Sequence, residues 1–423
     1  MSLNVAILPD GRKALILRTS DRIAFKQCRR KWGWSSHLKR NLGSKHLASP
    51  LWFGSAIHYA LEDYHGANVF GSPARAFQAY CIATSKQHNR ELPGDAQELY
   101  HLGIAMMNYY VDHWLRFRKI RPTYVVDGVP QVEVNFEIPV PLDEHPVLAS
   151  HAARLGADCV LYRGTIDAVA YDPDLKGLFI KEYKTAKRAE QMHYMTDPQI
   201  TTYVWAGSHI YNLPILGVEY WQFVKNKPEP PRILSSGKLS TASNLVSSYP
   251  LYYKAMEDMY GEAGRAPLEI QQKLAQLGNM EDENKDRFIL REPIYRNQHQ
   301  TQAEALKILL EAEDMLNPDL PLYPNPTRDC SRMCSFLGAC VTMDDGGDWE
   351  SELEMEFSQR DQAPDRMWRN RLPSPQKMLA MLDAGQHPIL ESIQGQVRSM
   401  EDDRRAAIEA GEEMDIPTTF SFE

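Results

Sequence analysis

The sequence lacks features that would assign it to several large classes of protein. No uninterrupted apolar run reaches the ~18 residues needed to cross a bilayer, so we expect no membrane partner. Residues 1–13 have no apolar stretch behind a basic end, so we expect no secretory signal and a cytoplasmic location, in the host cell if the protein is viral. Gly and Pro, 24 and 27 of 423 residues, are at ordinary levels. Collagenous and low-complexity chains are therefore excluded.

Excess positive charge, which drives phosphate binding, is also missing. The chain has 47 Lys and Arg against 56 Asp and Glu, a formal net charge of −9. The deficit is uneven, because residues 344–423 hold 19 acidic and 8 basic residues, a net charge of −11, which leaves +2 for residues 1–343. The net charge therefore excludes no nucleic-acid partner. The acidic segment itself indicates a solvated tail or a partner surface.

One stretch of the body is strongly basic. Residues 11–40 contain ten Lys and Arg and a single acid, Asp21, with Trp32 and Trp34 among them. This pattern suits a groove that follows a nucleic-acid backbone, because rings stack on bases while cations contact phosphates. A solvated basic face would have the same composition. If the stretch is a groove, the acidic tail could occupy it in the absence of DNA, and deletion of residues 345–423 should then raise DNA affinity.

Cysteine is scarce, with six residues, but three of them form a C-x3-C-x5-C cluster at Cys330, Cys334 and Cys340. Without a secretory signal, clustered thiolates are better interpreted as metal ligands than as disulfides. Cys28 is the candidate for a fourth ligand, because the Lys and Arg residues around it favour the thiolate. Four cysteines suit zinc or an iron–sulfur cluster, and the spacing does not separate these. Three unligated structural cysteines are the remaining alternative.

The middle of the chain predicts a β-hairpin. Residues 160–171 and 178–185 are rich in β-branched and aromatic side chains, and the segment between them is rich in turn residues. A symmetric register sets Asp167 opposite Glu182, where like charges are destabilising unless a divalent cation lies between them. Strand alternation places Lys184 on the face of Glu182. This set suits phosphodiester hydrolysis by metal-activated water that a lysine orients, whereas an exposed hairpin with Glu–Lys ion pairs is the simpler alternative.

Two predicted helices lie on either side of the hairpin in sequence. Asp197 and Pro198 indicate an N-cap followed by proline at the first helical position, and that helix places Gln199 and Tyr203 one turn apart. Upstream, residues 53–61 predict a helix that presents His58. Taken alone, a helical histidine is more often a packed or surface residue than a ligand.

Together these segments resemble the PD-(D/E)XK nuclease superfamily, in the RecB-like branch that includes the CRISPR-associated adaptation nuclease and the nuclease modules of helicase–nucleases. The resemblance covers about residues 19–340. It rests on motifs in the family's order: Cys28, Gly54-x-x-x-His58, Asp167, Glu182-Tyr183-Lys184, Gln199-x-x-x-Tyr203, and the cysteines Cys330, Cys334 and Cys340.

The resemblance implies an α/β fold with a restriction-endonuclease-like core, in which helices flank a central mixed β-sheet. It implies that His58, Asp167 and Glu182 bind Mg²⁺ or Mn²⁺ and that Lys184 is the catalytic lysine. It further implies that Gln199 and Tyr203 place the substrate backbone. The resemblance to the iron–sulfur subgroup implies that a [4Fe–4S] cluster is held by four cysteines: Cys28, Cys330, Cys334 and Cys340.

We therefore expect a nuclease domain over residues 1–343, with an insertion at about 225–286, and an acidic, partly helical or disordered extension over 344–423. The expected activity is metal-dependent DNA hydrolysis, as an exonuclease on single strands or duplex ends, in recombination, repair or replication. The chain has no Walker motif, so a helicase or recombinase partner would be a separate protein. The alternative function is that of a non-catalytic nucleic-acid-binding protein stapled by zinc or iron–sulfur. The insertion could clamp DNA, contact a partner, or be a plain surface loop.

Overall fold

A computed structural model describes residues 5–45, 49–87, 94–142, 156–189, 193–282, 287–317, 319–360 and 372–384. Within the acidic extension, the sequence also predicts a weak helix at residues 393–410, which lies outside these ranges. No helix among the described residues is both long and apolar enough to cross a membrane.

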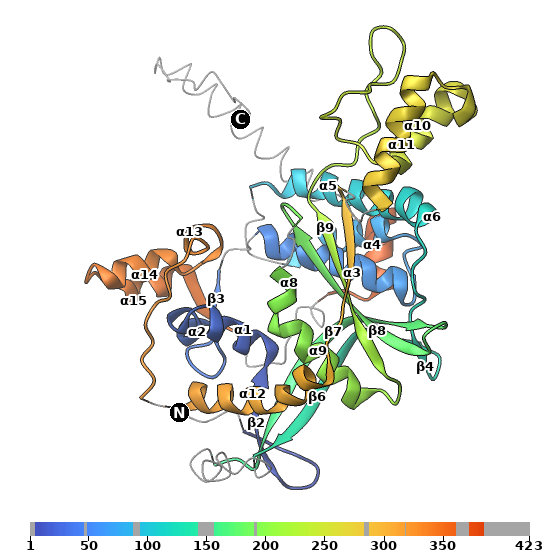
Figure 1. The fold of residues 1–423 in the computed structure, drawn as a ribbon. Coiled ribbons are helices and arrows are strands. Elements are labelled where there is room, and N and C mark those ends of the chain that lie inside the picture. The colour runs from blue at the N-terminus through green and yellow to red at the C-terminus, as the bar shows by residue number, and fades with distance from the viewer. Residues whose placement is uncertain are drawn as a thin grey trace, which may run out of the picture.

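A seven-stranded mixed sheet forms the centre of the molecule (Figure 1). Its path runs β1-β2-β7-β8-β9-β10, and β6 pairs with the other edge of β7. The β2–β7 and β8–β9 pairs are parallel and the other pairs are antiparallel. The strands are β1 (Val5–Ile7), β2 (Lys13–Arg18), β6 (Val132–Pro141), β7 (Cys159–Asp172), β8 (Gly177–Ala186), β9 (Ile215–Val224) and β10 (Ile289–Ile294).

The predicted hairpin is β7 and β8, and its predicted register is confirmed. Asp172 pairs with Gly177 and Ala168 with Lys181, so Asp167 and Glu182 follow next on the two strands. On the same edge of β7, residues 159–163 pair with β2 instead. Residues 164–167 therefore lie where β2 and β8 diverge from β7, and this divergence opens the sheet beside Asp167.

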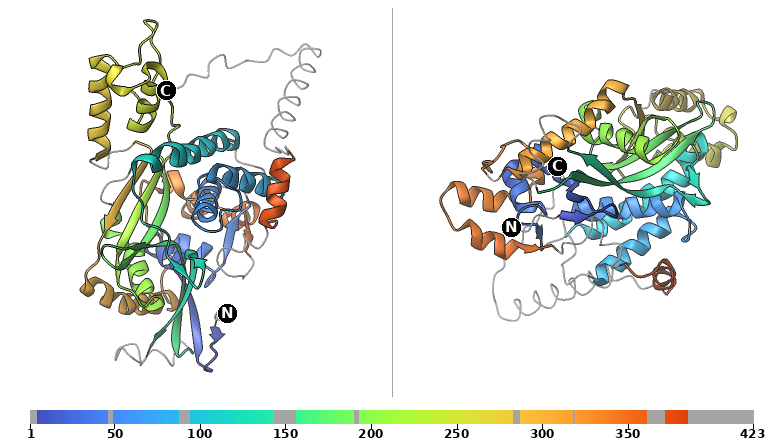
Figure 2. Two further views of the ribbon diagram at one scale, coloured as in Figure 1. Left: turned by 90° about the vertical axis from the view of Figure 1, so that its right-hand side faces the viewer. Right: turned by 90° about the horizontal axis from the view of Figure 1, so that it is seen from below.

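One face of the sheet is covered by helices that carry many aromatic residues, and Figure 2 shows them stacked beside the strands. Their apolar side chains pack on Ala168, Tyr183, Trp221 and Phe223 of the sheet. The helices of this layer are α3 (Ser49–His65), α4 (Pro73–Gln87), α5 (Ala96–Tyr109), a π-helical turn (Tyr110–Trp114), α6 (Leu115–Phe117) and, outermost, α17 (Pro375–Asp383).

A second layer covers the opposite face. Ile180 and Val218 of the sheet pack there against apolar residues such as Ile200 and Ile308. The helices are α1 (Thr19–Gln27), α8 (His193–Thr196), α9 (Pro198–Ile210) and α12 (Gln298–Leu316). The expected α/β fold, a mixed sheet flanked by helices, is therefore confirmed.

Residues 28–45 and 323–360 form a small unit that we call the cysteine module. It contains α2 (Arg29–Ser35), α13 (Cys330–Met333), α14 (Leu337–Asp344), α15 (Trp349–Glu356) and a two-stranded pair of β3 (Leu42–Ser44) with β11 (Phe357–Gln359). Trp34, Phe336, Leu353 and Phe357 form its buried core. The predicted boundary after residue 343 falls inside α14, and the described residues beyond it pack against this module or, as α17, against α4.

The insertion has a core of its own. Helices α10 (Tyr249–Tyr260) and α11 (Leu268–Asp282), joined by a 3-10 turn (Ala263–Arg265), pack around Tyr252 and Met256. Figure 1 shows them beyond the end of β9, away from the cysteine module. A further short pair, β4 (Val125–Val126) with β5 (Val129–Pro130), precedes β6.

Candidate active site

Titratable and polar side chains gather where the sheet opens at Asp167, and we call this set the carboxylate site: His58, Glu133, Asp167, Glu182, Lys184 and Gln199. Helix α3 contributes His58, strands β6, β7 and β8 contribute the three carboxylates and Lys184, and α9 contributes Gln199. Asp197 caps α9 as predicted, because its Oδ1 accepts the N–H of Gln199 at 2.8 Å.

Three of these side chains could share one metal ion. Nδ1 of His58 lies 3.3 Å from Oδ1 of Asp167 and 3.6 Å from Oε1 of Glu133. One ligand atom from each residue falls within a group whose members are all within 4.8 Å of one another. Two carboxylate oxygens and an imidazole nitrogen are donors that Mg²⁺ and Mn²⁺ accept, although Mg²⁺ prefers oxygen.

Glu133 is a residue that the sequence did not single out. It is 8% exposed although charged, and its φ of +49° places it in the left-handed region that non-glycine residues rarely adopt. Backbone strain of this kind persists where the surrounding structure imposes it, and it is commonest at functional sites. In sequence, Glu133 alternates with Val132 and Val134 and therefore resembles any residue on the polar face of a strand.

Asp167 and Glu182 have opposite electrostatic environments. Burial alone would raise the pKa of Asp167, but the His58 ring, Lys184 and the N–H of Tyr183, which donates to Asp167 Oδ2 at 2.8 Å, hold that pKa below its ordinary value. Burial and the nearby charge of Asp167 raise the pKa of Glu182 to about 7, against the opposing effect of Lys184. Oε2 of Glu182 is buried and has no hydrogen-bond partner among the described residues. A cation would satisfy this oxygen.

Lys184 links the carboxylates to α9. Its Nζ forms an ion pair with Oε1 of Glu182 and donates to Oε1 of Gln199 at 3.2 Å. Gln199 in turn donates from Nε2 to the hydroxyl of Tyr203 at 2.7 Å. Burial alone would lower the pKa of Lys184, but Glu182 and Asp167 outweigh it and raise that pKa. The ammonium is therefore positive and fixed in direction.

The structure thus brings together all the predicted residues around Asp167, but it divides them differently from the prediction. His58 and Asp167 group with Glu133, whereas Glu182 is near Asp167, outside that group, and pairs with Lys184.

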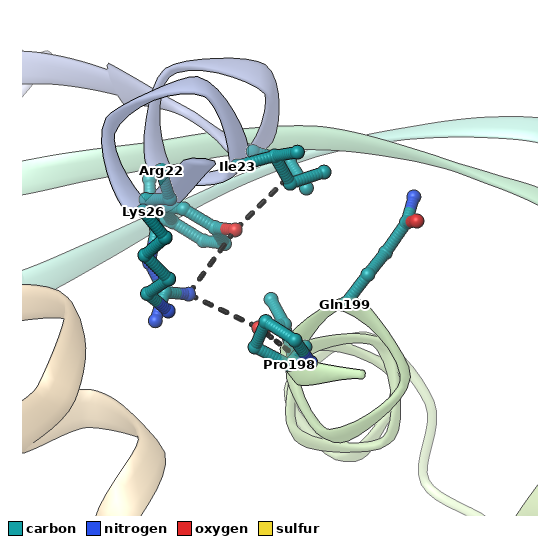
Figure 3. Close-up of a pocket in the computed structure, with 8 residues that line it drawn as sticks. Arg22, Ile23, Lys26, Pro198 and Gln199 are labelled. Atoms are coloured by element: carbon teal, nitrogen blue, oxygen red, sulfur yellow. Dashed lines mark hydrogen bonds between the residues drawn. The ribbon is translucent and has the colours of Figure 1, made fainter. Parts of the chain in front are cut away.

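A small pocket borders Gln199 on its α1 side, and Figure 3 shows Arg22 and Lys26 facing Pro198 and Gln199 across it. These cations are engaged. Arg22 pairs with Glu304 at 2.9 Å and with Glu311 at 2.6 Å, and Lys26 pairs with Glu311 at 2.6 Å.

Other cations of the basic stretch are also paired, since Arg30 meets Asp344 at 2.7 Å and Arg40 meets Glu350 at 3.8 Å. These ion pairs engage only part of the stretch, since Arg29, Lys31 and Lys39 form no ion pair with a described residue. The solvated basic face and the groove for a nucleic-acid backbone therefore both stay predictions. Two acidic residues from beyond position 343, Asp344 and Glu350, do contact the basic stretch, and both belong to the folded cysteine module.

The candidate cysteines come from both ends of the described chain. Arg30 Nη1 donates to Cys340 Sγ at 3.1 Å, and the N–H of Asn325 donates to Cys28 Sγ at 3.5 Å. Burial raises the pKa of Cys334, and the nearby sulfurs of Cys330 and Cys28 raise it further. Residues 28 and 330–340 are therefore neighbours in space, as predicted.

Comparison with known families agrees with this geometry. The family model described as PD-(D/E)XK nuclease superfamily matches residues 20–341. The chain belongs to this superfamily. Membership in the PD-(D/E)XK nuclease superfamily indicates a metal-dependent nuclease, a hydrolase with a nucleic-acid substrate. No curated protein matches the chain.

Proposed function

We propose that the chain is a Mg²⁺- or Mn²⁺-dependent deoxyribonuclease, acting as an exonuclease on single strands or duplex ends during DNA recombination, repair or replication. The proposed location is the cytoplasm, and any helicase or recombinase that works with it is a separate chain. The observation that carries the proposal is the buried, unpartnered Oε2 of Glu182 between Asp167 and Lys184.

The donor set fits a divalent cation. His58, Glu133 and Asp167 would hold it, with Glu182 completing the site from β8. A cation at these atoms also offsets the cost of three buried carboxylates that only one lysine accompanies. When bound, the ion supplies Lewis-acid activation of water and stabilises charge on phosphorus oxygens.

The residues of the chain supply positioning. Lys184 presents an ammonium that orients the attacking water and offsets developing negative charge. Gln199 fixes that ammonium by its hydrogen bond, and Tyr203 fixes Gln199. Gln199 is bordered by the pocket at α1, so its amide can also meet the substrate backbone.

We assign a [4Fe–4S] cluster to Cys28, Cys330, Cys334 and Cys340. The support is the nearness of Cys28 and Cys330 to Cys334 together with the order of the four cysteines, which resembles that of the iron–sulfur subgroup. Zinc held by the same four ligands is the alternative that metal analysis separates.

The decisive experiment for catalysis uses end-labelled DNA and RNA, single- and double-stranded, with each end blocked in turn. Glu182→Ala and Lys184→Ala should each lower Mn²⁺-dependent cleavage at least about 10³-fold while leaving thermal unfolding and most DNA binding intact. Lys176→Ala is the matched control, because Lys176 is exposed in the turn at the other end of β8. Cleavage that survives both active-site substitutions, or that needs no divalent ion, would reject the assignment.

The cluster is tested by iron and sulfide analysis and by visible absorbance of the purified chain. Broad absorbance with about four irons per chain is expected, whereas one bound zinc and no colour would reject iron. Iron–sulfur without any cleavage would instead leave the non-catalytic nucleic-acid-binding alternative.

A further inference from the structure

Lys187 and Lys225 are neighbours just beyond the C-terminal ends of strands β8 and β9. These strands are parallel, and their register pairs Ala186 with Val224, so Lys187 and Lys225 follow side by side. The N–H of Lys225 donates to the carbonyl of Ala186 at 2.8 Å, which fixes its backbone against the end of β8. Lys184 of the carboxylate site lies three residues before Lys187, about 10 Å along an extended strand.

The two ammonium groups lie near each other, and neither forms an ion pair with a described residue. Burial lowers the pKa of Lys225 and the charge of Lys187 lowers it further, while Asp95 acts in the opposite direction. Asp95 accepts the hydroxyl of Ser49 at 2.6 Å; it keeps its negative charge and offsets part of the repulsion without pairing with either lysine. Cations placed together in this way cost free energy unless an anion joins them.

Lys225 has a fixed position in the fold. Its Nζ lies 5.7 Å from the centroid of the ring of Phe53, a fully buried residue of α3. The next residue, Gly54, packs against β8 at ordinary contact distance, since a Cβ there would be 3.5 Å from Oγ1 of Thr185. Helix α3 also presents His58, so one helix orients both this ammonium and a side chain of the carboxylate site.

We propose that Lys187 and Lys225 form a phosphate clamp that holds the nucleic-acid backbone beside the carboxylate site. The proposal rests on the proposed nuclease function and deepens it, because it states where the strand leaves the site: over the C-terminal ends of β8 and β9. A phosphate distributes its charge over several oxygens and can accept from both ammonium groups at once. The clamp gives a role to the first residue of the insertion at 225–286.

The test measures binding of a fluorescein-labelled single-stranded DNA oligonucleotide to the full chain by anisotropy, without divalent ions, over a range of salt concentrations. The double variant Lys187→Gln/Lys225→Met removes both charges and keeps the stem that covers Phe53. Each lost phosphate contact lowers the slope of log affinity against log salt by about 0.7. We expect a loss of about 0.7 to 1.4 in slope and at least a tenfold weaker Kd. Lys176→Gln, which removes one charge from the other end of the same hairpin, should change neither.

Steady-state cleavage with Mn²⁺ separates a clamp from a catalytic or structural role. The double variant should raise KM about tenfold with little change in kcat, and Lys225→Arg alone should behave like the unaltered chain. An unchanged Kd and slope would overturn the clamp even if cleavage persists, and so would a fall in kcat at constant KM. A wild-type chain that binds with the lysine-dependent slope but never cleaves would overturn the proposed function and support the clamp.

Discussion

The carboxylate site and the cysteine module are built in contrasting ways. Strands β6, β7 and β8 carry most of the first site, which lies between the two large apolar clusters of the body. Short helices and a two-stranded pair make the second, whose own apolar cluster has five buried residues. A site that needs exact positions is thus held by rigid neighbours, whereas a unit with so small an apolar core would depend for its stability on the cluster that we propose it binds.

The strongest test of this contrast removes one proposed cysteine ligand. Cys28→Ser should lower the free energy of unfolding of the cysteine module by at least about 3 kcal/mol, because binding of the proposed cluster would be coupled to folding of the module. Circular dichroism and limited proteolysis would detect the loss, with iron content as a parallel measurement.

Cys81→Ala is the control, because Cys81 is buried in the large apolar cluster around α4 and alanine places no hydroxyl there. Removal of divalent ions by EDTA should lower the melting temperature less than Cys28→Ser does, because two large apolar clusters hold the carboxylate site. A module that stays folded after Cys28→Ser would show that its apolar core suffices.

The second test concerns the strained carboxylate of the other region. Glu133→Gly and Glu133→Ala should both lower cleavage about 10²-fold if Glu133 holds the metal ion. The Gly variant should be the more stable by about 1 kcal/mol, because glycine adopts φ of +49° without strain. Chemical denaturation measures this difference.

Glu137, further along β6, gives the opposite expectation. It is not among the residues with positive φ, so Glu137→Gly should be less stable than Glu137→Ala by about 0.5–1 kcal/mol. If the Gly and Ala variants had the same order of stability at both positions, the argument from backbone strain at Glu133 would fail.

The third test uses pH. Burial, with the charge of Lys181, lowers the pKa of His65 to about 3, and His65 hydrogen-bonds the hydroxyl of Tyr110 at 2.9 Å. The neutral ring is favoured in the folded state, so stability is full above pH ~6.5 and falls as pH drops toward 3, by about 1–2 kcal/mol between pH 6.5 and 5. Urea denaturation should show this slope reduced in His65→Gln. An identical slope would assign the pH dependence to other groups.

The smallest effect is expected on the surface of the cysteine module. Arg40 and Glu350 are both exposed and their closest atoms are 3.8 Å apart. Glu350→Gln should change the free energy of unfolding by less than about 0.5 kcal/mol, because exposed ion pairs contribute little. Thermal melts at low and high salt are sufficient to check it. A larger change would mean that charge, rather than the cluster, holds the module together.

Sequence patterns predicted the parts of the site that depend on local structure. The dense turn between β7 and β8 fixed the register that brings Asp167 next to Glu182, and Asp197 with Pro198 fixed the start of α9. Glu133 could not be predicted as a site residue. Strand alternation shows on which face of β6 its side chain lies, but not that α3 covers that face.

The basic stretch was harder to interpret for a similar reason. Residues 11–40 are rich in cations, but the carboxylates that pair with Arg22 and Arg30 come from α12 and α14. Glu304 of α12 lies 282 positions after Arg22, and Asp344 of α14 lies 314 positions after Arg30. Only the tertiary fold places those acids. Composition therefore indicated the charge, but not which of these cations are engaged in ion pairs.

The pairing of β3 with β11 has a consequence for synthesis in the cell. Leu42 meets Gln359 in that ladder, so the N-terminal half of the module waits until more than 300 further residues have been translated, roughly 15 to 60 s at ~5–20 residues per second. During that interval Cys28 and the apolar side chain of Trp34 have no partner from the C-terminal half. Assembly of the proposed cluster would therefore require translation past Cys340, and a chain terminated before that residue would leave this surface exposed to aggregation or proteolysis.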